Sequence, residues 1–427
     1  MKKMQLVSLL FFINVVVFAQ PANLAKTSAG FPVNYNEDSV GTYVLPELLT
    51  LSNGHKVTDA KTWSEQRRPE LLKLFEAIEY GKMPDAPAGI HFDVFDKGTP
   101  AFNGKAIRKQ VTVYFTRDTG NKMDLLIYLP ANTNKPVPLL LNVSFVANNQ
   151  ATDDPGVKMG EVWTKEGKKI KADQPSRFGK MNIEQFIDAG IGFACIYYGD
   201  IEPDFKDGIK YGIRKRYLEP GQQQPAANEW GAISAWAWGL SRAMDYFETD
   251  KQIDAKRIAL QGASRLGKTA LWTGVHDTRF KVVIASISGE GGAAISRRNY
   301  GENIKHITDT SRYYYQFAPN YHSYAGKVDS LPFDAHMLVA LMAPRPLLLQ
   351  TGDTDYWSDP KGEFLSAQAA TKVYELFGLK GPGNAAMPAA NDTSLLMNPL
   401  GYYMHAGGHA VLPEDWQLFI RYLKQYL

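Results

Sequence analysis

The chain has 427 residues, of which 44% are hydrophobic and 21% charged, and its formal net charge is +3 at pH 7. This length is enough for one large α/β domain with insertions or for two smaller domains, and the near-neutral charge argues against attraction to nucleic acid or to an acidic membrane surface. The single cysteine, Cys195, excludes an intramolecular disulfide.

The N-terminus has the pattern of a secretory signal peptide. Lys2 and Lys3 give a basic start, residues 9–18 are almost entirely apolar, and small residues follow near position 20. The apolar stretch is short for a membrane span, and no later segment approaches twenty uninterrupted apolar residues. We therefore expect cleavage near residue 20 and an exported, soluble mature protein, periplasmic or secreted.

The first half of the mature chain is predicted to supply one helix and several strands. Residues 21–48 are weakly patterned and predict an extended arm, and residues 63–80 have helical spacing, with Pro69 suited to the first turn. Strand-like segments follow at 109–116, 123–129, 137–145 and 190–198. Two polar excursions, near 147–180 and 200–224, are predicted to be surface insertions.

The second half alternates apolar strands with amphipathic helices. A long helix is predicted over residues 229–246 and a last one over residues 414–427. Between them, strand-to-helix units are expected at 257–274, from 281 into the 290s, and at 346–377. This alternation predicts a doubly wound, mostly parallel sheet. Because no repeat or low-complexity linker is present, we expect residues 21–427 to form a single catalytic domain.

Residues 262–268, Gly-Ala-Ser-Arg-Leu-Gly-Lys, directly follow the apolar run 257–261 and precede a predicted helix. A buried strand, a glycine-flanked turn that presents one serine, and a helix together form the nucleophile elbow of an α/β-hydrolase. The segment therefore predicts Ser264 as a nucleophile and a three-layer α/β-hydrolase sandwich. The second glycine, Gly267, comes one residue later than in the common Gly-x-Ser-x-Gly pattern.

A serine nucleophile needs an acid and a base, which in this fold follow the serine in that order. Asp355 lies just after the apolar strand 347–351 and is our candidate acid, with Asp353 as the alternative; either could instead cap the next helix or lie in a solvated loop. Of the two histidines in His-Ala-Gly-Gly-His, His409 is the candidate base and His405 a packed or supporting residue. No spacing typical of a metal centre is present.

Taken together, these residues resemble the glucuronoyl esterases of carbohydrate esterase family 15. The likeness covers most of the chain after the signal peptide, and its most specific part is Ser-Arg-x-Gly-Lys at residues 264–268. The resemblance implies that Arg265 contributes to an oxyanion hole, by its backbone N–H and its permanently charged guanidinium. Without the resemblance, Arg265 would be interpreted as a surface cation paired with a carboxylate.

Three more positions match residues that contact the sugar in that family. The resemblance implies that Lys268 donates to sugar hydroxyls, that Glu302 accepts from them, and that Trp357 lines the uronate pocket. From the residues alone, Lys268 and Glu302 would be solvated charges and Trp357 a core residue.

The chain departs from the fungal members of the family at the triad acid. Fungal members carry a glutamate at the position of Ile287, whereas the nearest carboxylate here is Glu290, three residues later. This resembles the bacterial branch, in which the acid after the later strand takes over, and it favours Asp355. Glu290 is a candidate second carboxylate near the base.

The resemblance implies hydrolysis of the ester between 4-O-methyl-glucuronic acid of glucuronoxylan and lignin alcohols, by a Ser-His-Asp acyl-enzyme mechanism without metal or cofactor. We expect a monomer whose partner is this lignin–carbohydrate ester, with no nucleic acid or membrane partner. Two alternatives stay open: a carbohydrate acetyl esterase of the same fold, and a hydrolase-fold protein that binds glycans without catalysis.

Overall fold

The computed structural model describes residues 26–427 except 177 and 179. The predicted signal peptide of residues 1–20 lies outside the described residues. Across the part that is described, no helix combines the length and the apolar character needed to cross a membrane. The described part of the arm contains a short hairpin, β1 (Thr27–Ser28) and β2 (Phe31–Pro32), and one 3-10 turn at Glu37–Ser39.

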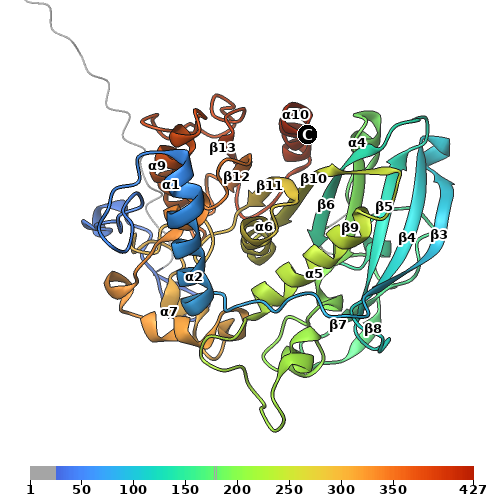
Figure 1. The fold of residues 1–427 in the computed structure, drawn as a ribbon, viewed down its shortest axis with the longest axis horizontal. Helices are drawn as coiled ribbons and strands as arrows, with labels where there is room; N and C mark the ends of the chain where they lie inside the picture. Colours follow the sequence, from blue (N-terminus) through green and yellow to red (C-terminus); the bar gives the residue numbers. More distant parts are fainter. Residues whose placement is uncertain (1–25, 177, 179) are drawn as a thin grey trace, which may run out of the picture.

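The centre of the structure is a sheet of nine strands in the order β13-β12-β11-β10-β6-β9-β5-β4-β3 (Figure 1). All neighbours from β9 to β13 run parallel, whereas β5, β4 and β3 form an antiparallel edge. The predicted mostly parallel sheet is therefore confirmed. The strands span His91–Ala101 (β3), Ala106–Tyr114 (β4), Lys122–Pro130 (β5), Val137–Ser144 (β6), Gly192–Tyr197 (β9), Ile253–Ala263 (β10), Phe280–Ser286 (β11), Leu347–Gly352 (β12) and Leu400–His405 (β13).

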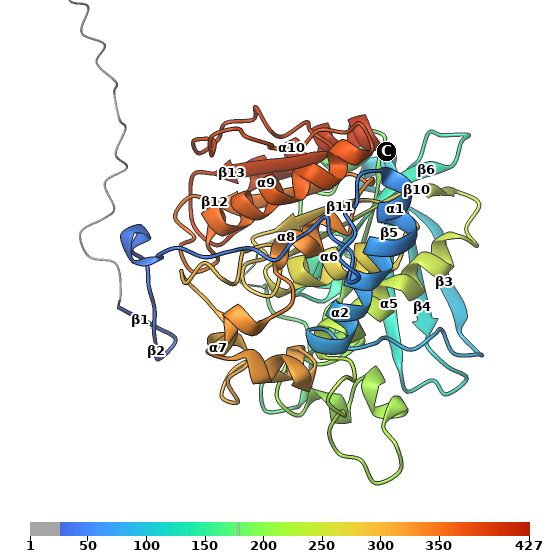
Figure 2. The same ribbon diagram turned by 60° about the vertical axis from the view of Figure 1, so that its left-hand side comes forward.

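Helices cover both faces of this sheet (Figure 2). Successive side chains of a strand point to opposite faces, so Leu139 and Leu141 of β6 pack in one hydrophobic cluster and Leu140 in another. The first cluster includes residues of α2, α5, α6, α8 and α9, and the second includes residues of α4 and α10. Three layers result, as predicted. The helices are Ala60–Thr62 (α1), Arg68–Ile78 (α2), Asn148–Ala151 (α3), Glu184–Asp188 (α4), Ala232–Phe247 (α5), Arg265–His276 (α6), Ile304–Ile307 (α7), Ala335–Ala340 (α8), Pro360–Leu376 (α9) and Pro413–Tyr426 (α10).

The chain after β11 differs from the prediction. A strand-to-helix unit is expected there, but the chain forms a loop that reaches the short α7 only at Ile304. Gly289 and Gly291 adopt φ angles of 61° and 65°, and Ile287 has a φ of 44°. This alternation of left-handed residues prevents a regular helix. The resulting loop lies at the edge of the sheet where β10 and β12 also end.

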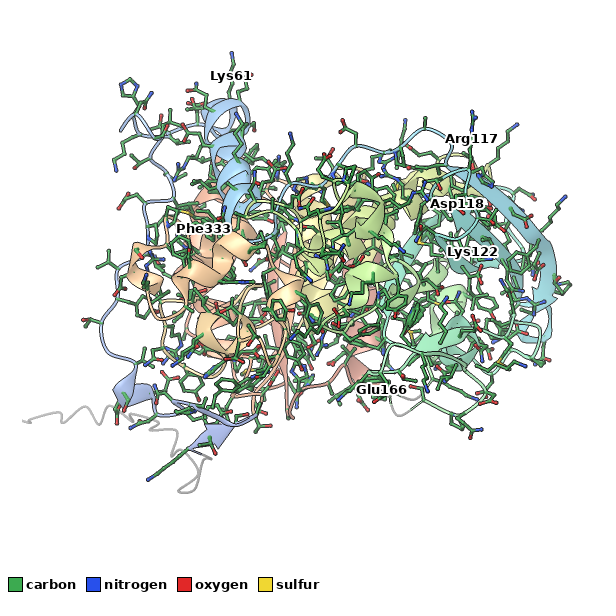
Figure 3. All side chains as sticks on the ribbon, turned by 90° about the horizontal axis from the view of Figure 1, so that it is seen from below. Lys61, Arg117, Asp118, Lys122, Glu166 and Phe333 are labelled. Carbon is green, nitrogen blue, oxygen red and sulfur yellow. The ribbon has the colours of Figure 1, made fainter. Side chains whose placement is uncertain are left out.

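The two polar excursions pack against each other. The first contains the hairpin of β7 (Glu161–Trp163) and β8 (Lys169–Lys171), whose exposed turn is marked by Glu166 in Figure 3. The second contributes Phe205 and Tyr211, whose ring centroids lie 6.0 and 5.0 Å from that of Trp163. The excursions thus form one outer wall, and Asp204 at the inner end of this wall reaches the site described below.

Candidate active site

Ser264 lies between the last residue of β10 and the first residue of α6, at φ 58° and ψ −128°. A positive φ is strained for serine and must be imposed by the surrounding backbone. A Cβ on Gly262 would lie 2.1 Å from the Leu266 carbonyl oxygen, and a Cβ on Gly267 would lie 2.6 Å from the Ser286 carbonyl oxygen. Both glycines are therefore required for the turn, and the contact with Ser286 explains why the second one stands at position 267.

Helix α6 begins at the residue after Ser264. The first backbone N–H groups of a helix have no intrahelical acceptor, so those of Arg265 and Leu266 can bind an anion beside the serine. The N–H of Ser264 itself donates to the Ser286 carbonyl at 2.9 Å, which ties the turn to β11. This arrangement suits a negative charge that develops on an oxygen next to Ser264.

The Arg265 guanidinium pairs with Asp204, with 2.5 Å between Nη1 and Oδ2. Burial alone would raise the pKa of the Asp204 carboxyl, but the charge of Arg265, together with the hydrogen bonds that the carboxylate accepts, outweighs burial and lowers it. Asp204 also accepts hydrogen bonds from Tyr198, Tyr315 and Gln316. The Tyr313 ring lies 4.5 Å from the guanidinium carbon. The carboxylate partner of Arg265 is therefore buried rather than on the surface, and it holds the cation at the elbow.

His409 and Asp355 are joined by a hydrogen bond of 2.7 Å between Nδ1 and Oδ2. They follow the adjacent parallel strands β13 and β12, whose carboxyl ends meet at one edge of the sheet. The Asp355 side chain is 3% exposed and that of His409 is 44% exposed. A buried carboxylate thus holds an accessible imidazole, whose Nε2 has no hydrogen-bond partner among the described residues. The Ser358 hydroxyl, which sequence reasoning missed, lies 3.1 Å from the same Nδ1.

His405 and Asp353 hold the loop that carries His409. Asp353 accepts a hydrogen bond from the Gly407 N–H at 2.8 Å, and Nε2 of His405 lies 3.1 Å from the Gly408 carbonyl oxygen. Burial would lower the pKa of His405, but the hydrogen bond to Asp415 and the charge of that carboxylate, with the Gly408 carbonyl and Asp353 adding to them, together outweigh burial and raise it. The structure therefore brings Asp355, not Asp353, to the imidazole of His409. His405 supports the backbone of the loop that precedes His409.

Glu290 lies in the interior and is hydrogen-bonded to residues other than His409. Its carboxylate accepts hydrogen bonds from the Ser296 hydroxyl at 2.7 Å and from the Tyr321 hydroxyl at 3.3 Å, and no bond to His409 is present among the described residues. Burial raises the pKa of Glu290 well above its usual range. The structure thus does not bring this predicted second carboxylate to the imidazole.

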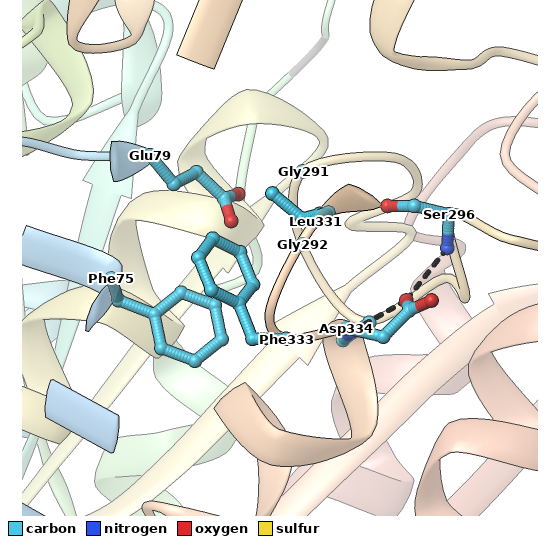
Figure 4. A pocket seen from close by; sticks show the side chains of 9 residues that line it. Phe75, Glu79, Gly291, Gly292, Ser296, Leu331, Phe333 and Asp334 are labelled. Atoms are coloured by element: carbon cyan, nitrogen blue, oxygen red, sulfur yellow. Dashed lines mark hydrogen bonds between the residues drawn. The ribbon is translucent and has the colours of Figure 1, made fainter. Parts of the chain in front are cut away.

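A small buried cavity lies beside this interior carboxylate and is lined by Glu79 and by the loop after β11 (Figure 4). Burial, with a smaller contribution from the charge of Asp334, raises the pKa of Glu79 to about 8. Glu79 is 4% exposed, so in neutral solution the folded protein keeps a proton that the unfolded chain would release.

Replacement of Glu79 by Gln is expected to flatten the dependence of Tm on pH. Between pH 4.5 and 8 the folded state binds more protons at this residue than the unfolded state, so this contribution to stability is lost as pH rises. Thermal unfolding of the wild type and of Glu79→Gln at pH 5 and pH 8 measures the effect. The exposed Glu65→Gln serves as control. An equal fall in Tm for wild type and Glu79→Gln would contradict the prediction.

Lys268, Glu302 and Trp357, the residues predicted to contact a sugar, lie at the same edge of the sheet. Lys268 is one helical turn beyond Ser264; burial lowers the pKa of its ammonium group, and the nearby charge of Glu302 opposes that shift. The Glu302 N–H donates to the Trp357 carbonyl at 2.8 Å. Sequence reasoning missed Arg312, which pairs with Glu302, because no motif marks it.

In the part of the chain that the structure describes, no group of three or more His, Cys, Asp or Glu side chains is placed to hold a metal ion. The arrangement offers a strained serine, free helix N–H groups, a carboxylate-bound imidazole and a cluster of charged and aromatic side chains. Such a set can carry out acyl transfer through a covalent serine intermediate.

Comparisons with known proteins point to one group of enzymes. A family model described as glucuronyl esterase of fungi matches residues 224–378. A carbohydrate esterase from an unknown prokaryotic organism is 43% identical over 420 residues, which cover 96% of this chain and 94% of that protein. A 4-O-methyl-glucuronoyl methylesterase from Neurospora crassa is 31% identical over 384 residues, or 86% of this chain and 83% of that protein.

Solved structures agree with these matches. The structure of a glucuronoyl esterase from Solibacter usitatus superposes with a TM-score of 0.85 at 45% identity, covering 91% of this chain and 99% of that chain.

Proposed function

Because this chain belongs to carbohydrate esterase family 15, the glucuronoyl esterases, we propose that it cleaves the ester between 4-O-methyl-glucuronic acid of glucuronoxylan and an alcohol of lignin. Members of this family are carboxylic ester hydrolases with the α/β-hydrolase fold. The observation that carries the proposal for the site is the 2.7 Å hydrogen bond between His409 and Asp355, at the same sheet edge as the strained Ser264.

The reaction proceeds in two acyl transfers. Oγ of Ser264 attacks the ester carbonyl carbon while Nε2 of His409 takes the serine proton, since Nδ1 is engaged by Asp355. The carbonyl oxygen becomes an oxyanion beside the N–H and the guanidinium of Arg265. When the tetrahedral intermediate collapses, the C–O bond to the alcohol breaks and His409 protonates the departing oxygen. Water then attacks the acyl-enzyme with the same proton transfers, and the uronic acid leaves.

The sugar ring is held by the cluster next to the elbow. The Lys268 ammonium group donates to ring hydroxyls and the Glu302 carboxylate accepts from them. Trp357 supplies an apolar face for the C–H side of the ring. Because Lys268 and Glu302 would both bind hydroxyls of the ring, the site favours binding of a uronoyl group over an acetyl group, which has no hydroxyls.

The mature protein, after removal of residues 1–20, is proposed to act outside the cytoplasm as a monomer, without metal or cofactor. Its partners are then the glucuronoxylan chain and the lignin to which that chain is esterified. The wall formed by the two polar excursions contacts Arg265 through the ion pair with Asp204.

Hydrolysis of benzyl glucuronate and of its methyl ester analogue tests the proposal. We expect the wild-type protein to cleave both with a higher kcat/KM than acetylated xylan, because the charged cluster recognises the uronoyl ring. Cleavage of acetyl esters alone would identify an acetyl esterase of the same fold. A folded protein that cleaves no ester and is not labelled at Ser264 by a fluorophosphonate would instead be a glycan-binding protein.

A further inference from the structure

Arg312 lies behind the proposed sugar site and uses only part of its hydrogen-bonding capacity. Its Nη2 donates to Oε1 of Glu302 at 3.0 Å, and both side chains are about nine-tenths buried, at 11% and 10% exposed. Its Nη1 is buried and has no hydrogen-bond partner among the described residues. A buried donor without an acceptor destabilises a protein, so its presence here calls for a reason.

Three aromatic rings surround the guanidinium and keep it in place. The guanidinium carbon lies 5.1 Å from the ring centroid of Trp357, 5.0 Å from that of Tyr313 and 5.8 Å from that of Phe31. Aromatic faces attract a cation, but they provide no lone pair comparable to that of a carbonyl or carboxylate oxygen. The surroundings thus fix the position of the charge and leave Nη1 without a protein acceptor.

The N-terminal arm supplies part of this enclosure. Phe31 packs edge-on against His306 with 5.4 Å between centroids, and the His306 ring stacks on Trp357 at 5.3 Å. Nε2 of His306 lies 3.0 Å from the Pro32 carbonyl oxygen, and the Gly301 N–H donates to the Asn34 carbonyl at 2.9 Å. The arm is therefore bonded to the loop that carries Glu302 and packs, through His306, beside Trp357.

We propose that Arg312 is a further substrate-binding residue, which orients the Glu302 carboxylate through Nη2 and donates from Nη1 to an oxygen of the bound uronoyl ring. This inference rests on the proposed function of the same site. Its neighbours Glu302 and Trp357 are two of the residues proposed to contact the sugar, so a ring that touches both lies within reach of the guanidinium.

The oxygens of the sugar ring can be shared between Arg312 as a donor and Glu302 as an acceptor. Oε1 of Glu302 is used by Arg312, which leaves Oε2 to accept from a sugar hydroxyl. A guanidinium only donates, and an ether oxygen such as that of a 4-O-methyl group only accepts. Arg312 therefore complements oxygens of the ring that Glu302 cannot bind.

The test compares Arg312→Ala and Arg312→Lys with the wild type, each also in a Ser264→Ala background. The exposed Arg216, which pairs with Asp118, provides the matched control Arg216→Ala. Calorimetric titration of the Ser264→Ala proteins with benzyl glucuronate measures Kd without turnover. Steady-state kinetics of the active proteins give kcat and KM for the same ester and for p-nitrophenyl acetate, which has no sugar ring.

We expect Arg312→Ala to raise Kd and KM for benzyl glucuronate about 10- to 100-fold, the range for loss of a hydrogen bond from a charged donor. Arg312→Lys, which keeps the charge but not the planar fork, is expected to recover only part of this loss. Cleavage of p-nitrophenyl acetate and the behaviour of Arg216→Ala should stay within about twofold of the wild type.

An unchanged Kd in Arg312→Ala would overturn the inference, and so would an equal loss toward both esters, which indicates a merely structural role. Thermal unfolding of each variant identifies loss of fold. If Arg312→Ala does not fold, the Kd of Arg312→Lys decides whether Arg312 binds the substrate. The proposed function fails separately, if the wild type does not cleave benzyl glucuronate. Binding to the Ser264→Ala protein would still show whether Arg312 contacts the uronoyl ring.

Discussion

Replacement of Ser264 by Ala is expected to lower kcat toward benzyl glucuronate about 10⁶-fold, the size of effect seen when a serine hydrolase loses its nucleophile. Without Oγ no acyl-enzyme can form, and only the oxyanion donors and substrate binding are left to assist direct attack by water. Alanine retains a Cβ, so the backbone strain at φ 58° is the same in both proteins and the fold is expected to persist.

Initial rates of benzyl alcohol release by wild type and variant measure this effect, with thermal unfolding as a check of the fold. Ser330→Ala, at an exposed serine on the surface, is the matched control and should retain full activity. Fluorophosphonate labelling followed by peptide mass spectrometry locates the reactive serine. Activity of the Ser264→Ala protein at even a hundredth of the wild-type rate would remove Ser264 from the mechanism.

Replacement of Asp355 by Asn is expected to lower kcat about 10⁴-fold. The buried carboxylate bonds Nδ1 of His409 at 2.7 Å, which keeps Nε2 free to take the serine proton and stabilises the imidazolium that forms. An amide of the same shape can present its N–H to Nδ1 instead, which favours the wrong tautomer, and it carries no charge. Ground-state substrate binding does not involve this carboxylate, so KM should change little.

Asp353→Asn is the matched control, because it makes the same chemical change two residues away. Asp353 accepts a hydrogen bond from the Gly407 N–H, so its loss should loosen the loop of His409 and reduce kcat far less than Asp355→Asn does. Glu290→Gln should likewise leave most of kcat intact, since Glu290 bonds Ser296 and Tyr321. If kcat of either control fell as far as that of Asp355→Asn, the residue replaced in that control would be a candidate for the acid of the triad.

The elbow could be predicted because it is local. A strand, two glycines, a serine and a helix lie within residues 253–276, and each element has its own pattern in the sequence. The late second glycine was the one irregularity. The structure explains it by the close approach of Gly267 to the Ser286 carbonyl of the next strand, a contact that no spacing rule reports.

The loop after β11 could not be predicted in the same way. Its apolar and glycine-rich sequence was compatible with a strand-to-helix unit, and the position of Glu290 in the chain suggested a carboxylate near the base. Left-handed backbone at Ile287, Gly289 and Gly291 produces the irregular loop, in which Glu290 lies in the interior. Glu363 of α9 accepts the Gly289 N–H at 2.7 Å, so a helix distant in the sequence takes part in fixing this path.

The sequence by itself determined the elements whose cause lies in neighbouring residues: the elbow at Ser264, the helices with apolar periodicity, the mostly parallel character of the sheet, and Asp355 as the first choice of acid. Only the tertiary structure decided which side chains meet across the chain. Asp204 reaches Arg265 from 61 residues away, and Arg312 is enclosed by rings from the arm and from two loops. The physical reason is that ion pairs and ring contacts act over a few ångströms in space, whereas sequence patterns report only neighbours along the chain.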